Sequence, residues 1–231
     1  MGFLKNFFRN VFEEDIVAQA TSSSFECLDE STLEAHLGVN RYGDFSLSAA
    51  VRPSYDLEVV PSAGFRHDTY RDEATRQKVP VLMASASQEQ LFDTFLELLD
   101  PLGPVVDVVL ETSHDYTQSG HRDLYREHID MPILQSILWD FEELLVDDGC
   151  TGIAVLNSSI PQEVQLDEHK LMIIYGNDLR EYEHLLQDAD IPCRDDMRFI
   201  TEAEHVHSTN DQYIEQFEQL KMRLGIDGEE C

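Results

Sequence analysis

The stretch that decides the predicted fold covers residues 80–110 and reads PVLMASASQEQLFDTFLELLDPLGPVVDVVL. Residues 81–84 are all apolar and residues 105–110 are apolar except for Asp107, as in buried strands. Between them, Ser87 and Gln90 form a capping box at the start of an amphipathic helix. A strand, a helix and a strand within about 30 residues are typical of a βαβ unit, whose two strands lie parallel in one sheet.

A second unit of the same kind is predicted in the C-terminal half. Its strands cover 171–175 and 197–201, and Asn177 can cap the helix between them. A further helix at 131–146 carries an apolar stripe wide enough to cover a sheet. We therefore predict an α/β fold, with α+β as the alternative. Its sheet is mixed and mostly parallel, with flanking helices, and is built around two βαβ units.

Residues 1–62 are predicted to form an appendage that packs on a main domain of residues 63–231. Helical spacing of apolar residues predicts a short amphipathic helix at the start, followed by a linker and a β-hairpin at 45–60. The stripe of that helix consists of Phe3, Leu4, Phe7, Phe8, Val11 and Phe12. We expect the stripe to pack on the protein's own body, with a partner protein or a membrane surface as alternatives. Because Lys5 and Arg9 interrupt the apolar run, it predicts neither a signal peptide nor a transmembrane helix.

The charge of the chain excludes some partners. There are 46 acidic against 16 basic residues, a formal net charge of −30 at pH 7. Such a surface repels phosphate groups, so we expect neither nucleic acid nor an anionic membrane as a partner of the folded body. With twelve Arg against four Lys, the acid excess is typical of adaptation to high salt. Ordinary solubility and recognition of a basic partner are the alternatives.

Four cysteines, Cys27, Cys150, Cys193 and Cys231, lie far apart and lack the C-x-x-C spacing of zinc ribbons and redox motifs. They predict reduced thiols and hence a cytoplasmic protein. The sequence contains no H-E-x-x-H, G-x-S-x-G or G-x-G-x-x-G motif and no glycine-rich phosphate loop with Lys. The sequence therefore predicts no cofactor, and binding of an unidentified metal ion is kept as an alternative.

Two histidine patterns raise a metal hypothesis. His114, His121 and His128 recur at intervals of seven with aspartates close by, and imidazole with carboxylate suits zinc or iron. On a continuous helix they would share a face, but Thr, Ser and Gly between them favour an exposed loop. His205 and His207 form the second pattern, because alternate residues of a strand project to the same side.

The predicted parallel sheet supplies a second argument for a site. Ligands gather beyond the carboxyl ends of parallel strands, where Ser87 and Asn177 would begin helices and offer amide groups to an anion. At the same edge, His114 would be a general base or metal ligand, with Asp115 or Glu111 as its orienting carboxylate. The alternative is that these Ser and Asn residues only cap helices and form turns.

The only tryptophan of the chain points to a partner surface. Trp139 and Val146 lie a heptad apart on the predicted helix, opposite its main apolar stripe. Either the N-terminal helix or the hairpin covers them, or they bind a partner together with Phe7 and Phe8.

The function predicted from these observations is a non-enzymatic interaction or regulatory domain in the cytoplasm. Its partner would be another protein or a second copy of the chain, and we expect no integral membrane segment. The alternative is a hydrolase or a small-molecule- or anion-binding enzyme, with or without a metal ion, with its site at the strand ends around His114.

Overall fold

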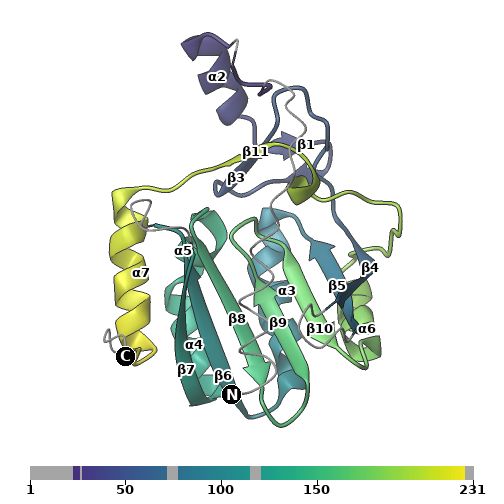
Figure 1. Ribbon diagram of the computed structural model, residues 1–231, viewed down its shortest axis with the longest axis vertical. Helices are drawn as coiled ribbons and strands as arrows, with labels where there is room; N and C mark the ends of the chain where they lie inside the picture. The colour runs from purple at the N-terminus through teal and green to yellow at the C-terminus, as the bar shows by residue number, and fades with distance from the viewer. Residues whose placement is uncertain (1–22, 27, 72–77, 115–120, 227–231) are drawn as a thin grey trace.

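The computed structural model describes residues 23–26, 28–71, 78–114 and 121–226, which form a seven-stranded sheet with helices and a smaller layer above it (Figure 1). The strand order in the sheet is β4-β5-β10-β9-β8-β6-β7, and every neighbouring pair is antiparallel. The strands are β4 (Gly64–Arg71), β5 (Lys78–Ser85), β6 (Val105–Thr112), β7 (Arg122–Asp130), β8 (Thr151–Asn157), β9 (Gln162–Leu166) and β10 (Met172–Gly176).

The predicted mostly parallel sheet is therefore wrong, and the fold is mixed α+β. The helix α3 (Gln88–Leu99) does return the chain so that β5 and β6 point the same way. These two strands are not neighbours, however, because β10, β9 and β8 lie between them and each step reverses the direction. The crossover through α3 therefore sets the relative direction of β5 and β6 but does not make them neighbours in the sheet.

The second predicted βαβ unit is also wrong. After β10, the helix α6 (Arg180–Asp188) begins three residues beyond Asn177, with Leu179 at its N-cap position. Residues 197–201 form no strand, and the last two of them belong to the short 3-10 helix η2 (Ile200–Glu202). Met197 and Phe199 instead pack on one face of the sheet.

The main hydrophobic core lies between the sheet and five helices. These helices are α3, α4 (Met131–Asp140), α5 (Glu142–Asp147), α6 and α7 (Asp211–Arg223), and a 3-10 helix, η1 (Asp100–Leu102), follows α3. Phe95, Leu110 and Leu134 are fully buried in this core, which the apolar stripes of the helices predict. The single helix predicted at 131–146 is broken at Phe141, whose backbone leaves the helical region (φ −125°).

A smaller layer sits above one end of the strands of the sheet (Figure 1). It contains α2 (Glu30–Leu37), β1 (Arg41–Tyr42), β2 (Phe45–Ser46), β3 (Val51–Pro53) and β11 (His205–His207). Strand β11 pairs antiparallel with β3, which joins the C-terminal part of the chain to residues of the predicted appendage. The predicted hairpin at 45–60 is wrong: β2 pairs with β1, β3 pairs with β11, and residues 55–60 form no strand.

The predicted N-terminal helix, with Phe7 and Phe8, and Asp115 lie outside the described residues. Across the part of the chain that the structure describes, no helix is both long and apolar enough to cross a bilayer.

Candidate metal centre

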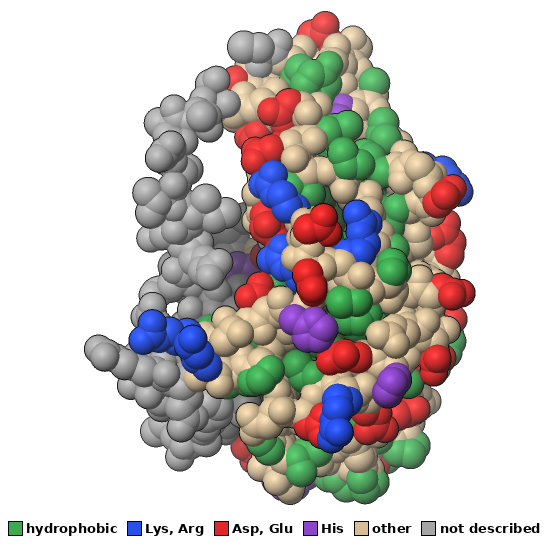
Figure 2. All heavy atoms as spheres, turned by 90° about the vertical axis from the view of Figure 1, so that its right-hand side faces the viewer, with side chains coloured by type: hydrophobic (Ala, Val, Ile, Leu, Met, Phe, Trp, Pro, Cys, Tyr) green, Lys and Arg blue, Asp and Glu red, His purple; other side chains and the backbone are tan. Residues whose placement is uncertain are grey.

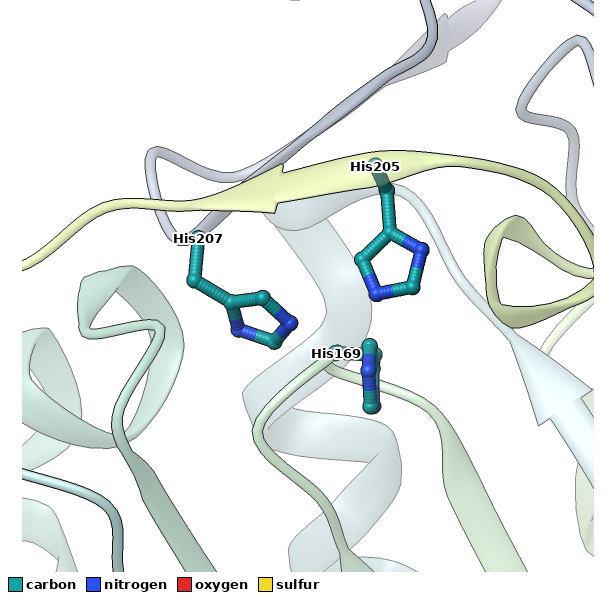
Figure 3. Close-up of side chains that lie close together, drawn as sticks. All are labelled: His169, His205 and His207. Atoms are coloured by element: carbon teal, nitrogen blue, oxygen red, sulfur yellow. The ribbon is translucent and has the colours of Figure 1, made fainter. Parts of the chain in front are cut away.

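Three histidines meet where the smaller layer faces the ends of the strands (Figure 3). His205 and His207 project from β11 toward the ring of His169, which lies in the turn between β9 and β10. The ring centroid of His169 lies 4.8 Å from that of His205 and 4.7 Å from that of His207. The centroids of His205 and His207 are 5.2 Å apart. The pairing of β11 with β3 therefore carries two histidines over a turn of the sheet.

Asp167 shapes the turn that presents His169. Its Oδ1 accepts hydrogen bonds from the backbone N–H of His169 (3.0 Å) and of Leu171 (2.8 Å). Lys170 adopts the left-handed conformation (φ 64°), and its N–H donates to the carbonyl of Asp167 at 3.0 Å. An Asp that bonds the backbone two residues on favours such a tight turn, so the sequence Asp-Glu-His-Lys fixes the position of His169.

The Nδ1 atom of each histidine is held by an oxygen acceptor. His169 Nδ1 lies 2.9 Å from Asp167 Oδ2, His205 Nδ1 lies 2.8 Å from the Ala203 carbonyl, and His207 Nδ1 lies 2.6 Å from the Gly149 carbonyl. Because a carboxylate and a carbonyl only accept, we infer that each Nδ1 carries the proton. Each Nε2 then has a free lone pair, the arrangement found around histidines that bind metals.

The spacing of the rings fits one shared ion. One ring nitrogen from each histidine lies within 4.8 Å of the other two. A tetrahedral zinc ion with Zn–N bonds of about 2.0–2.1 Å places its imidazole centroids roughly 5 Å apart and its ligand nitrogens roughly 3.4 Å apart. The centroid distances match this arrangement, and binding would turn the rings until their ligand nitrogens approach to roughly 3.4 Å.

The electrostatics of the cluster favour neutral ligands at two positions. Burial lowers the pKa of His205 and of His207, and the neighbouring His169 lowers both further. Burial also opposes the charging of His169, but Asp167 outweighs it and raises the pKa of that ring. Neutral imidazole is the form that binds a metal, and the carboxylate of Asp167 increases the basicity of His169 as a ligand.

Further ionisable groups surround the three rings. Glu168, whose Oε2 accepts a hydrogen bond from Ser113 Oγ at 2.9 Å, acts electrostatically on all three histidines. Lys170 is buried and donates from Nζ to the Thr151 carbonyl at 2.7 Å, and burial lowers its pKa to about 8. A cavity of about 20 Å³ borders His169 and Lys170, which is the size of roughly one water molecule.

The predicted heptad of histidines does not converge. His121 precedes β7 and His128 lies near the other end of that strand, which separates them by roughly 20 Å at the rise of an extended chain. His121 Nε2 lies 3.6 Å from Glu168, and His128 Nδ1 lies 3.9 Å from Asp107 with its side chain 74% exposed.

His114 has partners other than the predicted ones. Its Nε2 lies 2.9 Å from Asp148 Oδ2, its Nδ1 lies 2.9 Å from Thr112 Oγ1, and its ring packs edge-on against Phe217. Asp148 and His114, together with the buried Cys150, form a compact group of three potential ligands. The orienting carboxylate of His114 is thus Asp148.

Glu111 is buried and accepts hydrogen bonds from Gln165 Nε2 at 3.2 and 3.0 Å. Burial, and then the nearby Asp123, raise its pKa to about 8. Glu163, two residues before Gln165, is also fully buried, and burial raises its pKa well above the usual range. These carboxyl groups lie within the fold and do not join the three-histidine cluster.

The two predicted anion-binding residues lie at opposite ends of neighbouring strands. Ser87 follows the end of β5 and Asn177 follows the end of β10, and these adjacent strands are antiparallel. Ser87 Oγ accepts a hydrogen bond from the Ser46 N–H at 3.0 Å. The two residues therefore cannot share one ligand site.

Of the two described residues predicted to form a partner surface, Trp139 is exposed and Val146 is not. Trp139 is 54% exposed, and its ring packs edge-on against Phe92 with centroids 5.2 Å apart. Val146 is buried, because the break at Phe141 turns α5 relative to α4.

Comparison with protein families, with curated proteins and with solved structures finds no match for this chain. The fold and the candidate site therefore define it only as an α+β protein with a three-histidine cluster at the turn between two interior strands of an antiparallel sheet.

Proposed function

We propose that this protein binds one transition-metal ion through His169, His205 and His207. The observation that carries the proposal is the common arrangement of the three rings. Each Nδ1 is bound to a fixed oxygen, and the rings nevertheless converge with centroids 4.7–5.2 Å apart. Because imidazole ligands in tetrahedral geometry suit zinc, we take zinc as the ion.

A set of three protein ligands supports a catalytic rather than a structural centre. Structural zinc sites have four protein ligands, whereas catalytic sites keep one position for water or substrate. Bound zinc lowers the pKa of such a water toward neutrality and so supplies a nucleophile. We therefore propose metal-dependent hydrolysis, in which Asp167 orients His169 and Glu168 supplies negative charge beside the ion. This takes up the hydrolase that the sequence offered as the alternative to an interaction domain, and moves its centre from His114 to His169.

The test of metal binding uses full-length protein without a histidine tag. We expect the metal-stripped protein to regain stoichiometric zinc with micromolar or tighter affinity. His205→Ala should weaken binding at least about 100-fold, since a ligand is lost. His128→Asn is the matched control, because His128 is exposed and carries a left-handed backbone that Asn tolerates. Equal zinc binding by both variants would contradict the proposal, and circular dichroism checks that each variant is folded.

A second candidate function is binding of another protein through Trp139. Its support is the large exposed area of this side chain on an acidic protein, which favours a basic partner over a second copy. We expect the cytoplasm as the setting. Sedimentation of the native protein and of Trp139→Ala at low and high salt tests self-association: a dimer that the substitution dissociates would contradict a partner of a different kind.

A further inference from the structure

A second group of metal-ligand side chains lies on the outer edge of the sheet, on the side that Figure 2 shows. It consists of His67 from β4 with Cys193 and Asp195 from the loop after α6. Acidic, basic and histidine side chains are intermixed on that face. All three residues are exposed, so the group is open to solvent.

Backbone hydrogen bonds hold the loop against β4. The N–H of Phe65 donates to the Pro192 carbonyl at 2.9 Å, and the N–H of Arg194 donates to the Phe65 carbonyl at 2.7 Å. Phe65 and Cys193 form a parallel β-bridge. Because alternate residues of a strand project to the same side, His67 is carried next to Cys193 by the fold and not by chance contact of mobile side chains.

The three ligand atoms form a nearly equilateral triangle. Cys193 Sγ lies 4.0 Å from His67 Nδ1 and 3.7 Å from Asp195 Oδ1, and His67 Nδ1 lies 3.6 Å from Asp195 Oδ1. A tetrahedral zinc ion with bonds of about 2.3 Å to sulfur and about 2.0–2.1 Å to nitrogen and oxygen separates such ligands by roughly 3.3–3.6 Å. Each side of the triangle is therefore within about half an ångström of the required length.

Glu183 of α6 completes the arrangement from behind the ring. Its Oε1 lies 3.0 Å from His67 Nε2, the nitrogen that faces away from the triangle. A carboxylate that holds the second nitrogen of a histidine fixes the ring and raises its basicity as a ligand. Two independent features of His67, its spacing and its orientation, thus favour the same use of Nδ1.

We propose that His67, Cys193 and Asp195 form a second metal site, which takes a zinc-class divalent ion and keeps a fourth position for water. The thiolate and the carboxylate balance the charge of the ion, and binding releases the thiol proton to solvent. This site differs from the three-histidine centre in its sulfur ligand and its exposure, and the proposal does not depend on that centre.

Cobalt(II) distinguishes the two sites, because only a thiolate ligand gives an intense sulfur-to-cobalt charge-transfer band in the near ultraviolet. The experiment is a cobalt titration of metal-stripped, reduced, full-length protein. We expect a thiolate band that saturates as cobalt is added, is lost in Cys193→Ser and persists in His205→Ala, where it should saturate at one equivalent because the three-histidine centre is then disabled. Asp195→Asn should weaken this binding at least about 10-fold.

Cys27→Ser and Cys231→Ser are the matched controls and should keep the band. A band that survives in Cys193→Ser, or no thiolate band in the native protein, would overturn the proposal. Since Cys193 is exposed, its replacement by Ser should leave the fold intact, and an unchanged circular dichroism spectrum verifies this. Failure of the three-histidine centre would appear separately, as unchanged zinc binding in His205→Ala.

Discussion

Asp167 accepts hydrogen bonds from the backbone of its own turn through Oδ1 and from the ring of His169 through Oδ2. In Asp167→Asn the amide oxygen can still hold the turn, but the amide nitrogen then meets the Nδ1–H of His169 as a second donor. We predict that zinc affinity falls roughly 10- to 100-fold with little change in fold, as for other residues that orient ligands. A competition titration with a zinc chelator measures the affinity. Asp188→Asn, at an exposed position, is the control, and equal affinities in the two variants would contradict this role.

Part of the three-histidine cluster could be predicted from individual residues. The alternation of His205 and His207 predicted two ligands on one side of a strand. His169 could not be added, because it lies in a separate turn and meets them only through the pairing of β11 with β3. The available signal was Asp167, a carboxylate two residues before a histidine at the end of an apolar strand. The regular spacing of His114, His121 and His128 carried no geometric meaning once these residues were found at turns and along a strand.

The buried Glu111 makes the stability of the folded protein depend on pH. Burial, with a smaller effect of Asp123, raises its pKa from 4.5 to about 8 in the folded protein. As the pH rises through this interval, the unfolded chain ionises and the folded chain does not, so stability is lost. The cost has an upper bound of about 5 kcal/mol at pH 8.

We therefore predict that Glu111→Gln, which can still accept from Gln165, raises the melting temperature more at pH 8 than at pH 5. Calorimetry at the two pH values measures the difference, and Glu215→Gln at an exposed position should show none. A gain that is the same at both pH values would mean that Glu111 is charged in the folded protein.

At the scale of elements, helices and strands were easier to predict than their pairing. The strands predicted at 81–84, 105–110 and 171–175 all exist, because each is a mainly apolar run bounded by turn residues. The parallel sheet was wrong because a crossover helix fixes only the direction of the two strands that it joins. The short connections β8–β9 and β9–β10 were the better signal, since parallel neighbours need a dozen or more residues between them and antiparallel ones do not.

Gly149 controls how β11 reaches the sheet. Its N–H donates to the Ser208 carbonyl at 2.8 Å, and its own carbonyl holds His207 Nδ1. A Cβ atom at this position would clash with the Ala50 carbonyl and lie 2.9 Å from the Ser208 nitrogen, both of them backbone atoms.

We predict that Gly149→Ala lowers the free energy of unfolding by about 1–3 kcal/mol and weakens zinc binding, because β11 must move away. Denaturant unfolding and zinc titration of one sample measure both effects. Gly38→Ala is the control, because a Cβ there makes only ordinary contacts. Loss of stability with full zinc affinity would show that β11 does not position the ligands.

The net charge of −30 affects measurements of metal binding to the whole molecule. An acidic surface attracts divalent cations without specific ligands, and salt weakens that attraction. Zinc binding should therefore be measured at moderate salt with excess magnesium, which competes for carboxylates and not for imidazoles.

Under those conditions zinc should stabilise the whole molecule, because it would tie β11 to the turn of the sheet. Zinc at 100 times its Kd adds about 2.7 kcal/mol, which corresponds to roughly 5–10 °C in melting temperature for a chain of this size. Magnesium alone should give no comparable rise. A rise of the same size in His205→Ala would show that the three-histidine centre does not cause it.

The most direct test of the three-histidine centre is an anomalous difference map, recorded at the zinc absorption edge from crystals grown with enough zinc to fill both proposed sites. We predict a peak about 2.0–2.1 Å from one ring nitrogen of each of His169, His205 and His207. A map with no peak between these rings, whether zinc is found elsewhere or not at all, would contradict the account.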